Sequence, residues 1–224
     1  MASCKLCGNM GWLFSLTPNG LCDECERLVS MQLEQRERII EEEARGAEST
    51  VNPQSKLAHL DVQVENLAAM AHLEEQGIRK AEGASSRLRK SLAERDELIA
   101  KTARAELNEV LHSVRAAADA EAKLRFYSRL LLRLQDYEER LADKKPITAV
   151  VSRVRSAMAR IRLNILLDDA ARAERQGKPQ EAARLYRDAA TEFKALETDS
   201  PERAGRIAKL EEKAEKLSGP GSAE

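Results

Sequence analysis

The strongest constraint on this chain is a run of 62 residues, from Ala84 to Lys145, that contains neither glycine nor proline. Those two residue types are the ones that most weaken or end a helix, so the run is free to be helical throughout. The rest of the chain has a similar character, with 33% charged residues and only 3% aromatic residues. This composition excludes an all-β sandwich or barrel and predicts a mainly α-helical fold built from long helices.

Hydrophobic residues repeat every seven positions from residue 55 onward, which is typical of helices that pair along one face. The seam begins with Leu57, Leu60, Val64 and Leu67. It is interrupted by Glu74, Ser85 and Arg95. Gly83 followed by serines is typical of a helix end and a new helix start, so residues 55–145 form either a helical hairpin or a continuous coiled coil. The seam would serve self-association into a homo-oligomer or pairing within one chain.

All four cysteines lie near the N-terminus, in two C-x2-C pairs separated by fourteen residues. The pairs are Cys4 with Cys7 and Cys22 with Cys25. Two such pairs can surround one tetrahedral Zn(II) ion with four thiolates, and the alternatives are reversible disulfides or free thiols. A site with four cysteine ligands has no open position, so the zinc would be structural. Residues 1–27 are too few to bury a core of their own, so the metal would supply the folding energy.

Between the two pairs, residues 11–16 read as a short strand, and Pro18, Asn19 and Gly20 supply a turn. Residues 1–30 therefore resemble zinc-ribbon and treble-clef modules, in which a knuckle, a β-hairpin, a second knuckle and a helix follow in order. The resemblance implies that the four cysteines are the metal ligands. Trp12 and Phe14 either pack on the following helix or form an exposed anchor for a partner.

Near the C-terminus, alanines recur where two helices would approach closely, and Gly177 with Pro179 separates those helices. Tyr186 and Ala190 are spaced along the inner face of the second helix. Residues 163–217 resemble a tetratricopeptide-type hairpin or the start of a microtubule-interacting-and-trafficking (MIT) domain. A third apolar stripe favours the latter and predicts a three-helix bundle over residues 147–217. On this resemblance a groove beside Tyr186 would accept a partner helix or peptide, and the alternative is self-packing of the bundle.

Seven basic residues and a single acidic one lie between residues 140 and 162, although the whole chain has a net charge of −1. Arg153 and Arg160 are seven residues apart, as are Arg155 and Arg162, so each pair shares one flank of a helix. This basic flank could bind an acidic partner or a nucleic acid. The alternative is a solvated face that pairs with acidic helices such as residues 34–43.

The domain organisation predicted from these features has six parts. They are a zinc-ribbon-like module (1–27), a helix (28–45), a linker (46–54), a helical hairpin or coiled coil (55–145), the three-helix bundle (147–217) and a disordered tail (218–224). We expect no membrane insertion and a cytoplasmic location, because the chain shows neither a spanning segment nor a signal pattern. No nucleophile–base motif or phosphate loop is present, so we expect no enzymatic activity. The predicted function is a protein-interaction or scaffold role, and the alternative is a nucleic-acid-associated regulator that uses the basic flank.

Overall fold

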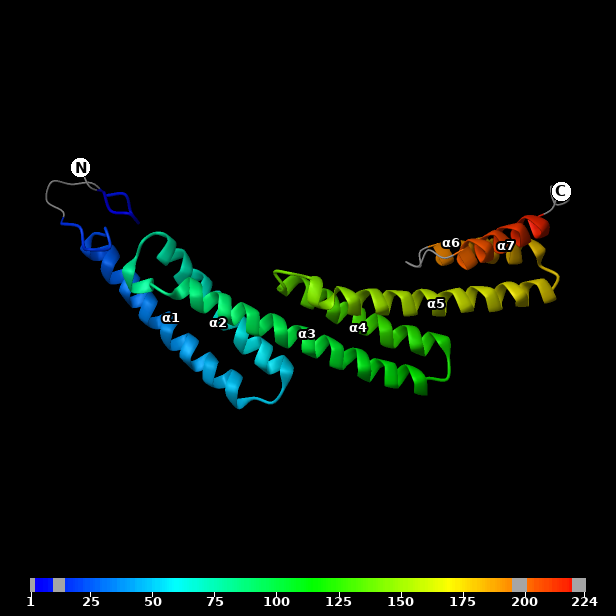
Figure 1. Ribbon diagram of the computed structural model, residues 1–224, viewed down its shortest axis with the longest axis horizontal. Coiled ribbons are helices and arrows are strands. Elements are labelled where there is room, and N and C mark those ends of the chain that lie inside the picture. The colour runs from blue at the N-terminus through cyan, green and yellow to red at the C-terminus, as the bar shows by residue number, and fades with distance from the viewer. Residues whose placement is uncertain (1–2, 10–14, 195–200, 219–224) are drawn as a thin grey trace. The chain divides into compact units, whose positions relative to one another are not determined.

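The computed structural model describes residues 3–9, 15–194 and 201–218 (Figure 1). Within these ranges the chain forms seven α-helices, one short 3-10 helix and no strand, which confirms the prediction of a mainly α protein. The predicted β-hairpin falls largely on residues 10–14, which lie outside the described ranges. The predicted disordered tail lies outside them too, apart from Ser218, which ends the last helix. The chain divides into two compact units, Met1–Thr102 and Ala103–Glu224.

The first unit contains helix α1 (Asp23–Ser49), helix α2 (Pro53–Glu75), the 3-10 helix η1 (Arg79–Ala81) and the first part of helix α3 (Ala84–Ala116). Helices α1 and α2 lie side by side and are joined by residues 50–52 (Figure 1). The side chain of Asn52 caps α2 by accepting hydrogen bonds from the backbone N–H groups of Gln54 and Ser55. The connection is shorter than the predicted linker of residues 46–54, because α1 continues through Gly46 to Ser49.

The chain turns between α2 and α3, so residues 55–145 do not form one continuous coiled coil. Gly77 ends α2 with a φ of 77°, in the left-handed region that favours glycine. Its N–H donates to the carbonyl of Glu74, and that of Ile78 donates to the carbonyl of Leu73. The carboxylate of Glu74 in turn accepts 2.7 Å hydrogen bonds from the backbone N–H groups of Gly83 and Ser85, where α3 begins. Hydrogen bonding from Ser85, chiefly from its side chain, lowers the pKa of Glu74, and the backbone N–H of Gly83 adds to the effect.

The heptad seam of α2 is buried within the chain itself, apart from Val64, which is half-buried. Leu57, Leu60 and Leu67 are each at most 1% exposed. Arg95 of α3, which interrupts the pattern in sequence, is also buried, and it forms an ion pair of 3.7 Å with Asp61 of α2. The structure therefore uses the seam for pairing within one chain. Self-association through it stays a prediction, and it would require these helices to separate.

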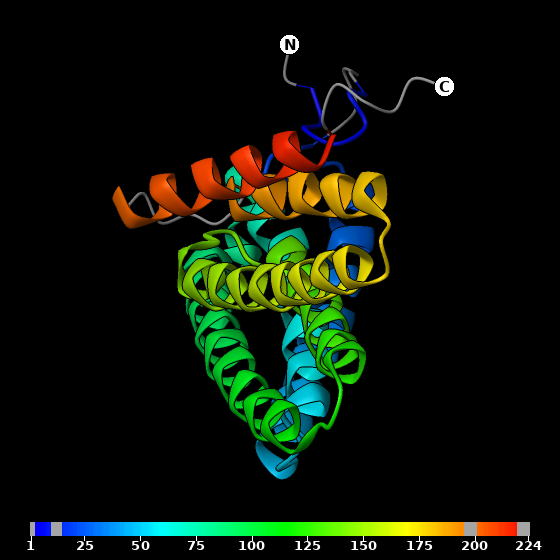
Figure 2. The same cartoon turned by 90° about the vertical axis from the view of Figure 1, so that its right-hand side faces the viewer.

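The second unit contains the rest of α3, helix α4 (Ala120–Arg140), helix α5 (Lys145–Arg175), helix α6 (Pro179–Lys194) and helix α7 (Pro201–Ser218). Residues 117–119 divide the run that lacks glycine and proline, and the side chain of Asp119 caps α4. Across the α3–α4 turn, the Tyr137 hydroxyl donates to Oε1 of the buried Glu106 at 3.1 Å. Helix α6 lies along both α5 and α7, as Figures 1 and 2 show.

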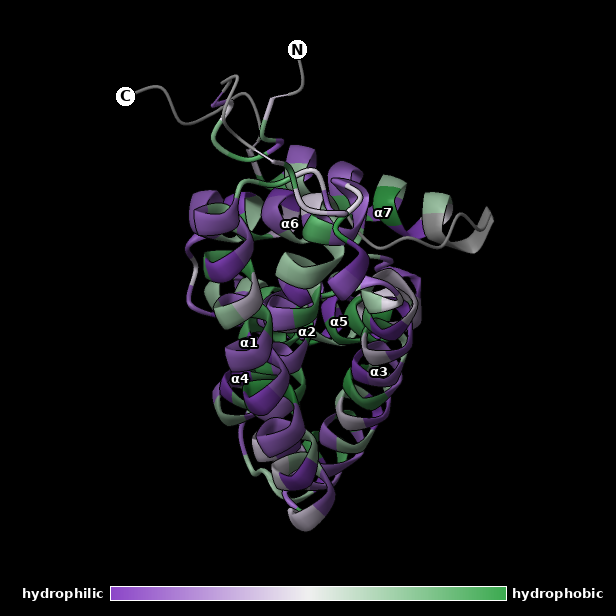
Figure 3. Ribbon diagram, turned by 90° about the vertical axis from the view of Figure 1, so that its left-hand side faces the viewer, coloured by the Kyte–Doolittle hydropathy of each residue, from purple (hydrophilic) through white to green (hydrophobic). Residues whose placement is uncertain are grey.

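Hydrophobic and polar residues are interspersed along the helices (Figure 3). They separate onto opposite faces clearly in α1, α4 and α6, and only weakly in α2 and α5. In the bundle of α5, α6 and α7 the buried side is made mostly of small residues. They are Ala170, Ala173, Ala182 and Ala214, packed with Tyr186. Alanines at these positions let the helix backbones approach closely. None of the helices in the described ranges combines the length and the hydropathy that a membrane span requires.

Candidate metal centre

The first cysteine pair lies on a tight turn formed by residues 4–9. The N–H of Gly8 donates to the carbonyl of Cys4 at 2.9 Å, and the N–H of Cys4 donates to the carbonyl of Asn9 at 3.0 Å. Gly8 has a φ of 69°, a conformation that residues with a side chain rarely adopt. The turn therefore brings Cys4 and Cys7 to the same side of the loop.

The second pair is placed by the start of α1. Cys22 is the N-cap residue of α1, and Cys25 belongs to its first turn. A second tight turn precedes them, in which the N–H of Gly20 donates to the carbonyl of Thr17 at 2.8 Å. The two loops are joined directly, because the N–H of Lys5 donates to the carbonyl of Gly20 at 3.0 Å.

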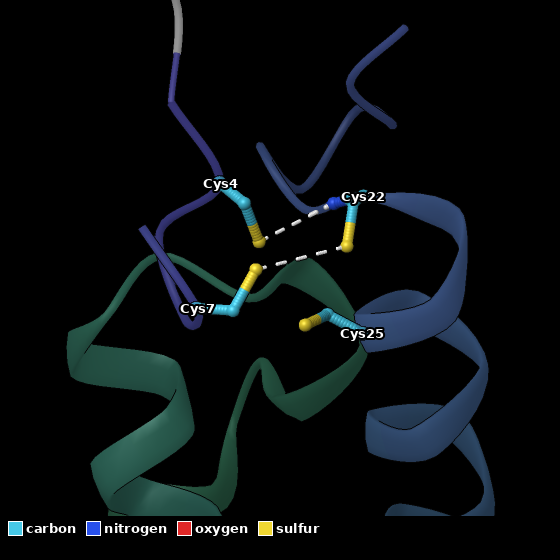
Figure 4. Close-up of side chains that lie close together, drawn as sticks. All are labelled: Cys4, Cys7, Cys22 and Cys25. Atoms are coloured by element: carbon cyan, nitrogen blue, oxygen red, sulfur yellow. Dashed lines mark hydrogen bonds between the residues drawn. The ribbon is translucent and has the colours of Figure 1, made fainter. Parts of the chain in front are cut away.

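The four cysteine side chains point toward one another (Figure 4). All four sulfur atoms lie within 4.8 Å of one another, and the Sγ atoms of Cys7 and Cys22 are 3.9 Å apart. Tetrahedral coordination with metal–sulfur bonds of about 2.3 Å would separate the sulfurs by about 3.8 Å, so the cluster fits a metal ion. Cys4, Cys22 and Cys25 are buried, whereas Cys7 is exposed.

The surrounding protein shifts the pKa values of two thiols, Cys4 and Cys25, in opposite directions. Hydrogen bonds from the backbone of Cys7 and Cys22 lower the pKa of Cys4 to about 6. One of them is the N–H of Cys22, 3.4 Å from the Sγ of Cys4 (Figure 4). Hydrogen bonding to Cys22 and burial raise the pKa of Cys25 to about 12. The site thus offers one thiolate readily, and a bound cation would have to displace the proton of Cys25.

A buried polar clip connects the metal loops to the helical hairpin. Asn19, 6% exposed, donates from Nδ2 to both carboxylate oxygens of Glu26, at 2.8 and 3.0 Å. Its Oδ1 accepts from the backbone N–H of Arg79 in η1 at 2.9 Å. Thr17 and Lys80 also contact Glu26, at 2.9 and 3.6 Å. These bonds lower the pKa of Glu26, the largest effect coming from Asn19. From the sequence, Asn19 was recognisable only as a turn residue and Glu26 only as an acidic residue at the start of a helix.

The cysteine cluster is also part of the hydrophobic core of the first unit. Leu21, Val29 and Ile78 are each at most 2% exposed and belong to the same buried cluster as Cys4, Cys22 and Cys25. That cluster extends to Leu67 and Met70 of α2. The described part of the N-terminal module is therefore packed on α1, α2 and η1. It shares their hydrophobic core and is not a separate domain.

The predicted partner residues are found in different environments. Trp12 and Phe14 lie outside the described residues. Tyr186 is 4% exposed, and its hydroxyl donates to Oε2 of Glu174 at 2.8 Å. Lys213 of α7 lies 4.4 Å from the centre of the Tyr186 ring. In this packing a partner would reach the ring only by displacing α7, and the role of Tyr186 in binding stays a prediction.

The four arginines of the basic flank are all exposed on α5. They are Arg153, Arg155, Arg160 and Arg162. Arg162 pairs with Glu192 of α6 at 3.7 Å, whereas Arg153 and Arg160 border a groove that also involves α3 and α4. The apolar residues of that groove, Leu107, Leu111 and Tyr127, were not identified from the sequence, because they come from two other helices.

Comparison with known proteins adds no relative: no protein-family model, curated protein or solved structure matches this chain.

Proposed function

We propose that this protein is a non-enzymatic adaptor that holds one structural Zn(II) ion at Cys4, Cys7, Cys22 and Cys25 and presents helical surfaces to protein partners. The observation that carries the proposal is the convergence of four thiols within 4.8 Å, three of them buried, where the N-terminal loops join α1. A set of four cysteines leaves no coordination position for a substrate, so the role it supports is structural.

The chemistry of the donor set favours zinc over most other cations. Four sulfur donors in tetrahedral order suit Zn(II) or an iron–sulfur cluster, whereas Mg(II) and Ca(II) prefer oxygen. Sulfurs 3.9 Å apart fit a single ion. A zinc-ribbon arrangement of residues 1–30 and a reducing, cytoplasmic location are part of the same proposal, since clustered cysteines bind metal where thiols stay reduced.

An exposed apolar surface supports the adaptor role. Leu28 is 47% exposed and Met31 is 60% exposed, on a face of α1 that follows directly from the metal loops. With Ile39 they border a groove of about 520 Å³, whose other five lining residues are polar or charged. Apolar side chains gathered on one helix face mark a contact surface more often than scattered single residues do. The metal would therefore hold in place the helix that carries a partner surface.

The metal is tested by measuring the zinc and iron contents of the purified protein, alongside its thermal unfolding. We expect about one zinc per chain, and loss of zinc with a lower unfolding temperature in Cys22→Ser. The matched control is Asp23→Asn, an exposed neighbour that is not a ligand. Iron in place of zinc, or zinc retained in Cys22→Ser, would contradict the assignment.

The adaptor role is tested by affinity purification of the tagged protein from its native cells, with and without nuclease. We expect protein partners that survive the nuclease. Loss of all partners on nuclease treatment would instead favour the second candidate, a nucleic-acid-associated regulator. That candidate is favoured by Arg153, Arg155 and Arg160, which are exposed and form no ion pair with a described residue. It predicts salt-sensitive binding that weakens in Arg153→Ala with Arg160→Ala.

A further inference from the structure

A groove lies within the second unit where α3, α4 and α5 come together. Its volume is about 320 Å³. Three helices contribute its lining residues, which are Leu107, Leu111, Tyr127, Arg153, Ser156, Ala157 and Arg160. The groove is thus a product of tertiary packing, and its chemistry combines apolar side chains with two cations.

The floor of the groove, which α3 and α4 contribute, is apolar apart from the Tyr127 hydroxyl, and Ser156 of α5 adds a second hydroxyl to the lining. Leu107 and Tyr127 are each 4% exposed, and Leu111 is half-buried. The Tyr127 hydroxyl is not one of the described polar atoms that are both buried and without a partner. The floor therefore offers a small hydrophobic surface together with a hydrogen-bonding group.

The two cations of the groove have no counter-charge beside them. Arg153 and Arg160 are exposed, neither forms an ion pair with a described residue, and no acidic side chain lines the groove. Arg162 on the same helix differs, since it pairs with Glu192. Seven residues of helix place Arg153 and Arg160 about 10 Å apart along α5. A ligand that complements them carries two negative charges at a similar separation.

We propose that this groove binds an acidic amphipathic helix of a protein partner, an inference that rests on the proposed adaptor function. Apolar side chains of the partner helix contact Leu111 and Ala157, which are half-buried. Two carboxylates about two helical turns apart pair with Arg153 and Arg160, which gives the complex its orientation. A protein helix fits better than a nucleic acid, because bases need exposed aromatic faces for stacking and Tyr127 is buried.

The test measures binding of a fluorescent peptide to the full-length, zinc-loaded protein by anisotropy. The probe is an amphipathic helical peptide of about 15 residues with leucines on one face and two glutamates seven positions apart. A second peptide has lysines in place of those glutamates. We expect the double variant Arg153→Glu with Arg160→Glu to bind the acidic peptide about tenfold more weakly than the unmodified protein does. The same variant should bind the lysine peptide more tightly. Arg129→Glu with Arg155→Glu is the control, since both arginines are exposed and lie outside the groove.

A second variant tests the floor without changing charge. Ala157→Phe fills the groove, so it should lower the affinity for the acidic peptide. Its circular dichroism spectrum should stay that of the unmodified protein, which shows that the helices are intact. Equal losses in the groove pair and the control pair would overturn the proposal, because binding would then follow overall charge. Binding that ignores Arg153 and Arg160, or no binding of the acidic peptide, would also overturn it.

An RNA probe of about 15 nucleotides separates the two kinds of ligand. RNA that competes with the acidic peptide and binds more tightly than it would overturn the proposal and assign the groove to nucleic acid. The adaptor function is judged separately, by the nuclease-resistant partners of the native protein. If such partners remain in Arg153→Glu with Arg160→Glu, the adaptor function stands even where the groove assignment fails.

Discussion

Replacing Asn19 by alanine tests whether the polar clip holds the metal loops on the helical hairpin. Asn19 is 6% exposed and binds Glu26 from one side and the backbone N–H of Arg79 from the other. Alanine removes both interactions, and neither asparagine nor alanine at this position is a metal ligand. The variant therefore separates the contribution of the clip from that of the cysteines.

The expected loss of stability follows from these bonds. A hydrogen bond to a charged group contributes about 1.5–3 kcal/mol, and one to a neutral backbone group about 0.5–1.5 kcal/mol. Glu26 keeps its contacts with Thr17 and Lys80, so the carboxylate is not left without partners. We therefore take the low part of the combined range and expect Asn19→Ala to lower the free energy of unfolding by about 2–3 kcal/mol.

The assay is urea unfolding followed by far-UV circular dichroism, with hydrogen exchange to assign the loss to residues 1–102. Asn108→Ala serves as the matched control because Asn108 is exposed on α3, and it should change stability little. Asn19→Asp should destabilise at least as much as alanine, since it places a second carboxylate against Glu26. A loss below about 0.5 kcal/mol in Asn19→Ala would refute the reasoning. So would a loss confined to the second unit.

Three further predictions concern helix packing. Gly46→Ala should destabilise the first unit by about 1 kcal/mol, because the new Cβ would lie 2.5 Å from the ring of His59. This clash should outweigh the better helix propensity of alanine, and a gain in urea resistance would contradict the prediction. Hydrogen bonds from Lys213 and Tyr186 lower the pKa of Glu174, so its stabilisation is present above the unfolded pKa of about 4.3 and is lost as the pH falls through the lower folded value. Glu174→Gln should therefore cost about 0.5–1 kcal/mol at neutral pH and nothing in strong acid, as measured by urea unfolding at both. Leu60→Ala with Leu67→Ala should cost about 4 kcal/mol or more and leave the mass in solution unchanged; a lower mass in light scattering would show that the seam joins two copies.

The parts of the fold that depend only on residues close together in the sequence could be predicted from the sequence. Helices follow from propensity and periodicity, which act within a few turns of the chain. The cysteine cluster was predictable for the same reason, because two C-x2-C pairs define a ligand set whatever the rest of the chain does. What remained open was whether the long helical run turns or continues as one helix. Residues 117–119 break it with one aspartate cap, a signal that recurs at many positions in a charged chain.

Contacts between distant segments were decided only by the tertiary structure. Glu74 and Arg95 read as defects in a heptad, yet one caps α3 and the other is buried against Asp61. The groove bordered by Arg153 and Arg160 needs three helices packed together before its apolar floor exists. The sequence by itself determined which segments are helical and which residues can bind a metal. The structure determined which polar side chains meet, because that depends on how separate helices and loops pack together, which no local pattern encodes.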